Sequence, residues 1–259
     1  MRGLYGKAAL VTGGSSGLGE AIVYRLAEEG VSVVVGGRDE ARARAVAAQA
    51  AERSRRQGHQ REHAVVLGDV SVVADCDRLV AEAVARFGGL DILVNSAGVW
   101  LEKSILETSE AEWEWCVGTC LKGTYFMCKA ALRHMVPRRA GVIVNLARDS
   151  GIHGEPGAAV YSAAKAGVVM LTRALAIDHG PDGIRVCSVS PAIFDTPMLA
   201  NAIAAAADPV AYTEGMEDEY PLKRIGRPEE LAAAVAFLAS DDGSFVSGRT
   251  LVVDGGVTA

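Results

Sequence analysis

The segment YSAAK places a phenol and an amine four residues apart, at Tyr161 and Lys165. On a helix, positions i and i+4 lie on the same face. An ammonium group close to a phenol favours the phenolate and lowers the pKa of the phenol from about 10 toward neutral pH. Such a pair can take or give a proton at an alcohol or carbonyl group. Because a YxxxK pattern alone is common, the rest of the chain decides whether this pair is catalytic.

A second segment, NLARDSG, runs from Asn145 to Gly151 and precedes YSAAK. Its Arg148 could steady a developing alkoxide or anchor a carboxylate or phosphate of a substrate. It could instead turn away from the site and pair with Asp149 or Glu155. A charge in a cleft is costly unless it is paired. We therefore expect a partner for Arg148, either an acidic substrate or Asp149.

Near the N-terminus, the segment TGGSSGLG spans Thr12 to Gly19 and joins an apolar run to a helix-like stretch. Glycines allow a tight turn and a close approach of the backbone to a pyrophosphate, and the start of a helix offers free N–H groups and a positive dipole end. A purely structural turn is the alternative. At this position the segment predicts a dinucleotide site formed by Gly13, Ser15, Ser16, Gly17, Leu18 and Gly19.

The second apolar run ends in VVVGGRDE, with Gly37 followed by Arg38. In NAD-binding domains, an acidic residue at the position of Gly37 accepts hydrogen bonds from the adenosine ribose. A carboxylate would repel a 2′-phosphate, whereas a guanidinium attracts it and can bind it through two hydrogen bonds. The sequence therefore predicts that NADP(H) is preferred over NAD(H), with Arg38 as its ligand. An ordinary surface arginine is the alternative.

These candidate residues follow strand-like apolar runs that alternate with helix-like segments along the whole chain. We expect helices from about Leu18 to Glu29, from near Asp39, and from about Asp75 to Phe87. The expected strands are AALVT, VSVVV, AVVLGDV, DILVNSAG, GVIVNL, IRVCSVSP and TLVVDGG. This alternation predicts an α/β protein, a doubly wound Rossmann-like fold with a seven-stranded parallel sheet and helices on both faces. No domain boundary is visible, so residues 1–259 are predicted to form a single catalytic domain.

The segment from Ala192 to Leu222 is different in character. It is rich in alanine, then acidic in the stretch EGMEDEY, and shows few periodic signals. It follows the sixth expected strand at the carboxyl edge of the sheet, where ligands bind in this architecture. We predict a substrate lid over residues 192–222, and the alternative is an ordinary surface insertion.

Composition excludes several classes of function. The net charge of −6 makes nucleic acid an unsuitable partner, because phosphate binding needs a basic surface. No apolar run reaches about 20 residues, so no membrane partner is expected. The five cysteines are an odd number without a CxxC motif, which favours a reduced, cytoplasmic protein. Cys116 and Cys120 have no further ligand nearby, so we expect a structural pair and no metal site.

Together these segments resemble the short-chain dehydrogenase/reductase family over nearly the whole chain. The resemblance rests on TGGSSGLG, Asp69-Val70, NSAG (Asn95 to Gly98), YSAAK, SPAIFDTPM and the ending PLKRIGRPEE…FLASDD…VSGRTLVVDGG. The ordered set is highly specific, although each piece alone is not. The resemblance implies a Rossmann-like fold, a bound nicotinamide dinucleotide, and hydride transfer at a carbonyl or alcohol carbon.

The resemblance also implies roles for individual residues. Tyr161 would be the acid/base, and Lys165 would bind the nicotinamide ribose and tune the tyrosine. The other implied cofactor contacts are Asp69 and Val70 at the adenine, Asn95, Ala97 and Gly98 along the pocket, and Ile193 and Thr196 at the carboxamide. The family further implies a homo-oligomer, a tetramer or a dimer. Apolar faces around Tyr125 to Met135 and Val168 to Ile177, and the apolar C-terminal strand, could form its interfaces.

Two positions depart from the family pattern. The catalytic serine of the family stands thirteen residues before the tyrosine, where this chain has Arg148. An asparagine that helps to hold a water in a proton relay is replaced by Cys120, which precedes LKGT. A serine hydroxyl both donates and accepts, whereas arginine only donates and stays charged. A thiol is a weak hydrogen-bonding group, so we expect Cys120 to be a poor relay member.

Three functions remain open at this stage. The first is an NADP(H)-dependent oxidoreductase with a modified proton-transfer site. The second is non-redox chemistry on the same scaffold, such as dehydration, cyclisation or isomerisation, and the third is a dinucleotide-binding protein with impaired turnover. The retained YxxxK pair weighs against the third. A small, partly apolar substrate is suggested by Trp100, Leu101, Phe194, Met198 and Tyr212.

Overall fold

A computed structural model describes residues 1–205 and 208–259, without the side chains of residues 205, 211, 212 and 214. Within these residues, one seven-stranded parallel sheet has the order β3-β2-β1-β4-β5-β6-β7. The strands are β1 (Ala8–Thr12), β2 (Ser32–Gly37), β3 (His63–Leu67), β4 (Ile92–Asn95), β5 (Gly141–Leu146), β6 (Ile184–Pro191) and β7 (Thr250–Val253). The predicted fold is confirmed. The order reverses between β1 and β4, which is where this architecture binds ligands.

The strands are apolar on both sides because helices cover both faces of the sheet. In β2, Val33 and Val35 belong to one buried cluster and Val34 to the other, as the alternation of side chains along a strand requires. Continuous valine-rich runs are typical of such doubly covered parallel strands. Because both faces are buried, these strands appear in the sequence as short, continuous apolar runs, and their length and flanking glycines identify them.

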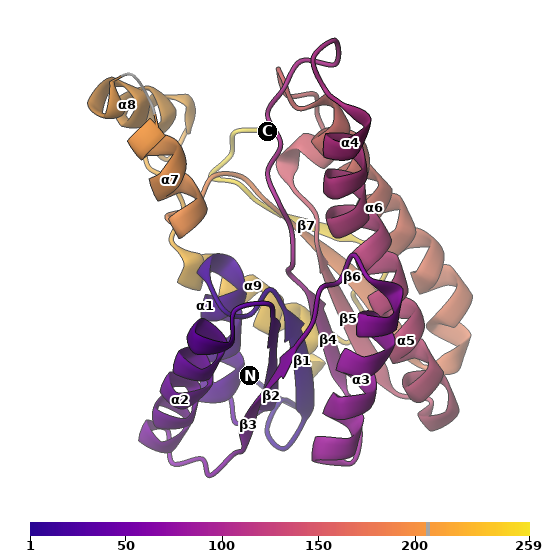
Figure 1. Ribbon diagram of the computed structural model, residues 1–259. Coiled ribbons are helices and arrows are strands. Elements are labelled where there is room, and N and C mark those ends of the chain that lie inside the picture. The colour runs from indigo at the N-terminus through magenta and orange to yellow at the C-terminus, as the bar shows by residue number, and fades with distance from the viewer. Residues whose placement is uncertain (206–207) are drawn as a thin grey trace.

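Two helical layers enclose the sheet (Figure 1). One layer holds α1 (Gly17–Glu28), α2 (Glu40–Arg56) and α9 (Pro228–Ala239). The other holds α3 (Val73–Phe87), α4 (Glu110–Val117), α5 (Gly123–Arg138) and α6 (Ala159–His179). The helix starts differ slightly from the expected ones. Asp39 lies just outside α2 and caps it, since its carboxylate accepts a hydrogen bond from the Arg42 N–H at 3.0 Å.

A π-helical turn, Gly118–Lys122, connects α4 to α5 and contains Cys120. The helical path continues through it, because Gly118 and Gly123 both keep helical backbone angles. A π-turn inserts one extra residue into a helix, and such turns are frequent at functional sites. The sequence predicted a helix here but gave no sign of the insertion.

The expected lid segment contains two short helices, α7 (Pro197–Ala205) and α8 (Pro209–Glu219). Figure 1 shows both helices projecting beyond the sheet, next to the path that leaves β6. Residues 206 and 207 and the side chain of Tyr212 lie outside the described residues. The role of the segment as a lid stays a prediction.

One helix in the described part of the chain, Ala159–Asp182, is long and apolar enough to cross a membrane by length and composition alone. It consists of α6 and a short 3₁₀ turn, Gly180–Asp182. α6 packs against β6 and the π-turn, and it carries the YSAAK segment. A core helix passes the same test, so this helix does not argue for a membrane partner.

A chain of buried polar side chains ties the middle of the sheet to α6. The Asn95 amide donates to Oδ1 of Asn145 at 2.9 Å, and the Asn145 amide donates to Oγ1 of Thr172 at 3.0 Å. The Thr172 hydroxyl donates in turn to the Val168 carbonyl at 2.9 Å. Because these groups are almost fully buried, each depends on its neighbour for a hydrogen bond.

We predict that Asn145→Ala lowers the free energy of unfolding by about 1–3 kcal/mol, because it removes one buried hydrogen bond from the Asn95 amide and one from the Thr172 hydroxyl. Chemical denaturation of both proteins measures the difference. Gln60→Ala, which removes an exposed amide, serves as the control. A change for Asn145→Ala of less than about 0.5 kcal/mol, as for ordinary surface substitutions, would contradict this account.

Candidate active site

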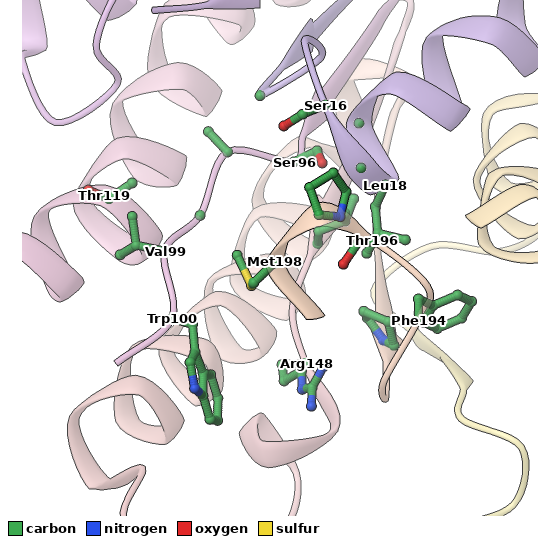
Figure 2. A pocket seen from close by; sticks show the side chains of 18 of the residues that line it. Ser16, Leu18, Ser96, Val99, Trp100, Thr119, Arg148, Phe194, Thr196 and Met198 are labelled. Atoms are coloured by element: carbon green, nitrogen blue, oxygen red, sulfur yellow. The ribbon is translucent and has the colours of Figure 1, made fainter. Parts of the chain in front are cut away.

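A cleft of about 550 Å³ opens at the carboxyl ends of the strands. Its walls come from the loops after β1 to β6 and from α7 and α8, as Figure 2 shows in part. The residues predicted from the sequence that line it are Gly13, Ser15, Ser16, Gly17, Leu18, Gly19, Arg38, Asp69, Val70, Ala97, Gly98, Arg148, Tyr161, Lys165, Ile193 and Thr196. The fold therefore brings distant segments of the sequence into one cavity.

The glycine-rich loop between β1 and α1 has the shape that a dinucleotide needs. Gly13 has a left-handed backbone (φ 64°), and a Cβ there would lie 2.8 Å from Cα of Ala97. A Cβ on Gly19 would lie 2.2 Å from the Gly13 carbonyl oxygen. The helix α1 begins at Gly17, and no side chain caps it from Ser16. Its first N–H groups therefore face the cleft free to bind phosphate, so the residues present fit the phosphates of a nicotinamide dinucleotide.

Arg38 stands at the rim of the cleft, after β2. Its Nη1 lies 3.4 Å from Oδ2 of Asp69, and the Arg38 side chain is exposed. Burial would raise the pKa of the Asp69 carboxyl, but hydrogen bonds from Ser71 and the Arg38 charge outweigh burial and lower that pKa. An exposed pair at this distance is weak. The Arg38 guanidinium can therefore leave Asp69 and bind a more highly charged anion such as a phosphate.

Asn95 is the predicted cofactor residue that does not line the cleft. Its side chain is buried behind the wall, where its amide donates to Asn145 and lies 3.3 Å from Sγ of Cys128. The sequence pattern missed Thr12, which does line the cleft. The Thr12 hydroxyl accepts hydrogen bonds from the N–H groups of Ser96 and Ala97, at 3.2 and 3.3 Å, and so joins the loops after β1 and β4.

Tyr161 lies on α6, at the floor of the cleft. The Trp100 ring packs edge-on against the Tyr161 ring, with 4.7 Å between centroids. Burial raises the pKa of the Tyr161 phenol, and the positive charge of Arg148 opposes that rise. The structure therefore does not show the lowering of the Tyr161 pKa by Lys165 that the sequence predicted. Removing a phenol from water disfavours the phenolate more than the nearby cations favour it.

Lys165 follows Tyr161 by one helical turn, and its side chain is buried. Its Nζ donates to the Leu146 carbonyl at 2.9 Å and lies 5.6 Å from the centre of the Tyr161 ring. Burial lowers the pKa of the Lys165 ammonium, while Cys120 raises it. The end of β5 thus holds the lysine in place through a backbone oxygen.

Arg148 follows β5 and points into the lower part of the cleft, opposite Trp100 (Figure 2). Its Nη1 donates to the Ala192 carbonyl at 2.6 Å, and its guanidinium carbon lies 5.7 Å from the centre of the Trp100 ring. Its Nε lies 2.7 Å from Oδ1 of Asp149, with the geometry of an ion pair rather than an aligned hydrogen bond. Arg148 therefore has an internal partner and still borders the space next to Tyr161.

Three acidic side chains also line the cleft, and the sequence analysis assigned a possible role only to Glu155, as a partner of Arg148. Glu155, Glu102 and Glu219 all line it. Oε2 of Glu155 is buried without a hydrogen-bond partner among the described residues, and burial raises the pKa of this carboxyl. Asp149 and Glu155 both interact electrostatically with Arg148, so carboxylates of the protein already stand beside this guanidinium. An acidic substrate is therefore a poorer partner for this arginine than the sequence suggested.

Several proteins of known activity are similar to this chain. The family model described as Enoyl-(Acyl carrier protein) reductase matches residues 13–258. Meso-2,3-butanediol dehydrogenase of Serratia marcescens is 39% identical over 98% of this chain and 95% of its own length. The 3-oxoacyl-[acyl-carrier-protein] reductase FabG of Chlamydia muridarum is 35% identical, with 98% of each chain covered. The crystal structure of levodione reductase superimposes with a TM-score of 0.92 at 34% identity, covering 97% of each chain.

Proposed function

The chain belongs to the short-chain dehydrogenase/reductase family and is an oxidoreductase, and from this premise we propose that it transfers hydride between NADP(H) and a carbonyl or alcohol carbon of a small, partly apolar substrate. The observation that carries the proposal is the convergence of Tyr161, Lys165 and the glycine-rich loop on one cleft. When bound, the nicotinamide supplies or accepts the hydride. The protein must supply orientation and a proton.

Tyr161 is the group proposed to hold and move that proton. Its phenol is kept protonated by burial in the free protein, which suits an acid that gives a proton to a forming alkoxide. Arg148 takes the place of a serine hydroxyl and would donate hydrogen bonds to the same oxygen. Its second partner, the Ala192 carbonyl, fixes the guanidinium against the loop after β6. Trp100 and Met198 offer apolar surface for the rest of the substrate.

The proposed catalytic domain is residues 1–259, with a lid over residues 192–222. Support for the lid comes from α7 and α8, because Met198, Leu199 and Ala202 of α7 and Met216 and Glu219 of α8 all line the cleft. A cytoplasmic location is proposed because all five cysteines are free thiols. The names of the similar proteins refer to a diol, a dione and a 3-oxoacyl group, so ketones and hydroxy ketones are the first substrates to test.

We predict that Arg148→Ala lowers kcat/KM for the best ketone by about 100-fold or more, the usual loss for one oxyanion donor. Arg148→Ser should keep more activity than Arg148→Ala, because a hydroxyl can still donate to the substrate oxygen. NADPH consumption is followed in both variants. Arg133→Ala, which removes a surface arginine paired with Asp77, is the control. If neither Arg148 variant differs from the parent in rate or substrate binding, Arg148 is not a working group.

We predict that Arg38→Ala weakens NADP(H) binding by about 1.5–3 kcal/mol and leaves NAD(H) binding nearly unchanged, because the guanidinium would meet only the 2′-phosphate. Calorimetric titration with both cofactors measures the two affinities. The control is Arg44→Ala, in which an exposed arginine loses its contact with Glu40. Equal affinities of the parent protein for the two cofactors would refute the proposed preference.

We also propose that the protein is a homo-oligomer, a tetramer or a dimer. Support comes from large apolar side chains exposed on neighbouring elements: Tyr125 of α5, Met170 and Ile177 of α6, and Leu251 and Val252 of β7. Monomers rarely leave such faces to water, and symmetric pairing would cover them. Light scattering at micromolar concentration should give a multiple of the chain mass. A monomeric mass under those conditions would be incompatible with this assembly.

A further inference from the structure

One carboxyl group in the cleft has no part in the proposed reaction and no ion-pair partner among the described residues. Glu155 lines the cleft from the loop between β5 and α6. The residues on both sides of it in this loop, 152–154 and 156–157, are exposed, whereas Glu155 is partly buried. The loop therefore turns one acidic side chain inward, among neighbours that face water.

The backbone around Glu155 is fixed to the rest of the site. The Glu155 carbonyl accepts a hydrogen bond from the Ala158 N–H at 3.2 Å, and the Gly157 carbonyl accepts one from the Lys103 N–H at 2.6 Å. Gly157 has a left-handed backbone (φ 69°), which glycine adopts without strain. Because Ala158 directly precedes α6, which carries Tyr161, these bonds hold Glu155 at a defined place relative to the tyrosine.

The guanidinium that could neutralise Glu155 is already used elsewhere. Arg148 lies 2.7 Å from Oδ1 of Asp149 and donates to the Ala192 carbonyl. Oε2 of Glu155 is buried without a hydrogen-bond partner among the described residues. A buried polar atom of this kind is costly unless a ligand or a water satisfies it. The cleft therefore contains a carboxyl group that is available for a polar group of the substrate.

The surroundings of Glu155 favour a hydroxyl group as its ligand. Arg148 acts electrostatically on both Glu155 and Tyr161, so one guanidinium lies near both groups. A hydroxyl group both donates and accepts, and it can therefore bind the carboxyl group in either protonation state. An ammonium group only donates, and it would bring a second positive charge near Arg148.

We propose that Glu155 determines substrate specificity by binding a hydroxyl group close to the reacting carbonyl, so that the enzyme prefers hydroxy ketones, and the diols formed from them, to simple ketones. This inference deepens the proposed oxidoreductase function and rests on it. Tyr161 and Arg148 hold the reacting oxygen, and Glu155 holds the second one. A small substrate that is held at two oxygens has its carbonyl carbon oriented for reaction.

The first test compares butan-2-one with 1-hydroxybutan-2-one and 4-hydroxybutan-2-one, which carry a hydroxyl group on the first or second carbon from the carbonyl. With NADPH, the parent protein should show kcat/KM about tenfold or more higher for one of the hydroxy ketones, as expected for one hydrogen bond to a carboxylate. Glu155→Leu should remove this preference. Glu155→Gln should keep most of it, because an amide still accepts and donates. Glu107→Leu, which changes an exposed glutamate outside the cleft, is the control.

Two kinetic results would overturn the inference and leave the oxidoreductase function standing. One is equal use of simple and hydroxy ketones by the parent protein, and the other is a preference that survives Glu155→Leu. A preference for 4-aminobutan-2-one that Glu155→Gln abolishes would also overturn it, because the ligand would then be an ammonium group.

The second test needs no turnover and separates this inference from the proposed function. Saturation-transfer NMR measures binding of the two hydroxy ketones and of butan-2-one to the protein with NADP⁺. Binding of a hydroxy ketone that weakens about tenfold or more in Glu155→Leu, and not in Glu107→Leu, supports the inference. Hydroxy ketone binding that is absent, or that Glu155→Leu leaves unchanged, overturns it. If the parent protein reduces no ketone, the proposed function fails and this binding experiment alone decides the role of Glu155.

Discussion

The site depends on holding two cations beside a buried phenol at the wall of one cleft. Lys165 and Arg148 are both largely buried, so each must be compensated inside the protein. The fold provides this at the end of β5, where Leu146 offers its carbonyl to Lys165, and Asp149 stands next to Arg148. The carboxyl edge of the sheet therefore brings these residues together and also supplies the backbone oxygens and the carboxylate that stabilise the two positive charges.

Arg148 stands where the family pattern has a serine, and this difference changes the electrostatics of the site more than its shape. A hydroxyl is neutral, whereas the guanidinium opposes the rise in the Tyr161 pKa that burial causes. Asp149 and the Ala192 carbonyl hold the guanidinium against the wall, so it does not fill the cleft. The result is a site in which the proton donor stays neutral and a guanidinium, itself paired with Asp149, borders the space next to it. That combination suits the stabilisation of a developing alkoxide.

The sheet, its order and the glycine-rich loop were predictable because they rest on local patterns. Valine-rich runs and the position of TGGSSGLG do not depend on distant contacts. The π-turn at Cys120 was not predictable, since it adjusts one helix to its neighbours and leaves no periodic signal. Asn95 was placed in the cofactor pocket by analogy, yet its amide is used inside the sheet. The sign of the Tyr161 pKa shift also depends on burial, which spacing along a helix does not reveal.

The central claim is that this modified site still performs hydride transfer. The most direct measurement is the fate of deuterium from NADPH labelled at the reactive ring carbon, with the product analysed by mass spectrometry. The account predicts one deuterium on the carbon that becomes the alcohol, and one cofactor oxidised for each product formed. A product without deuterium, formed while the cofactor stays reduced, would contradict it and would identify non-redox chemistry on this scaffold.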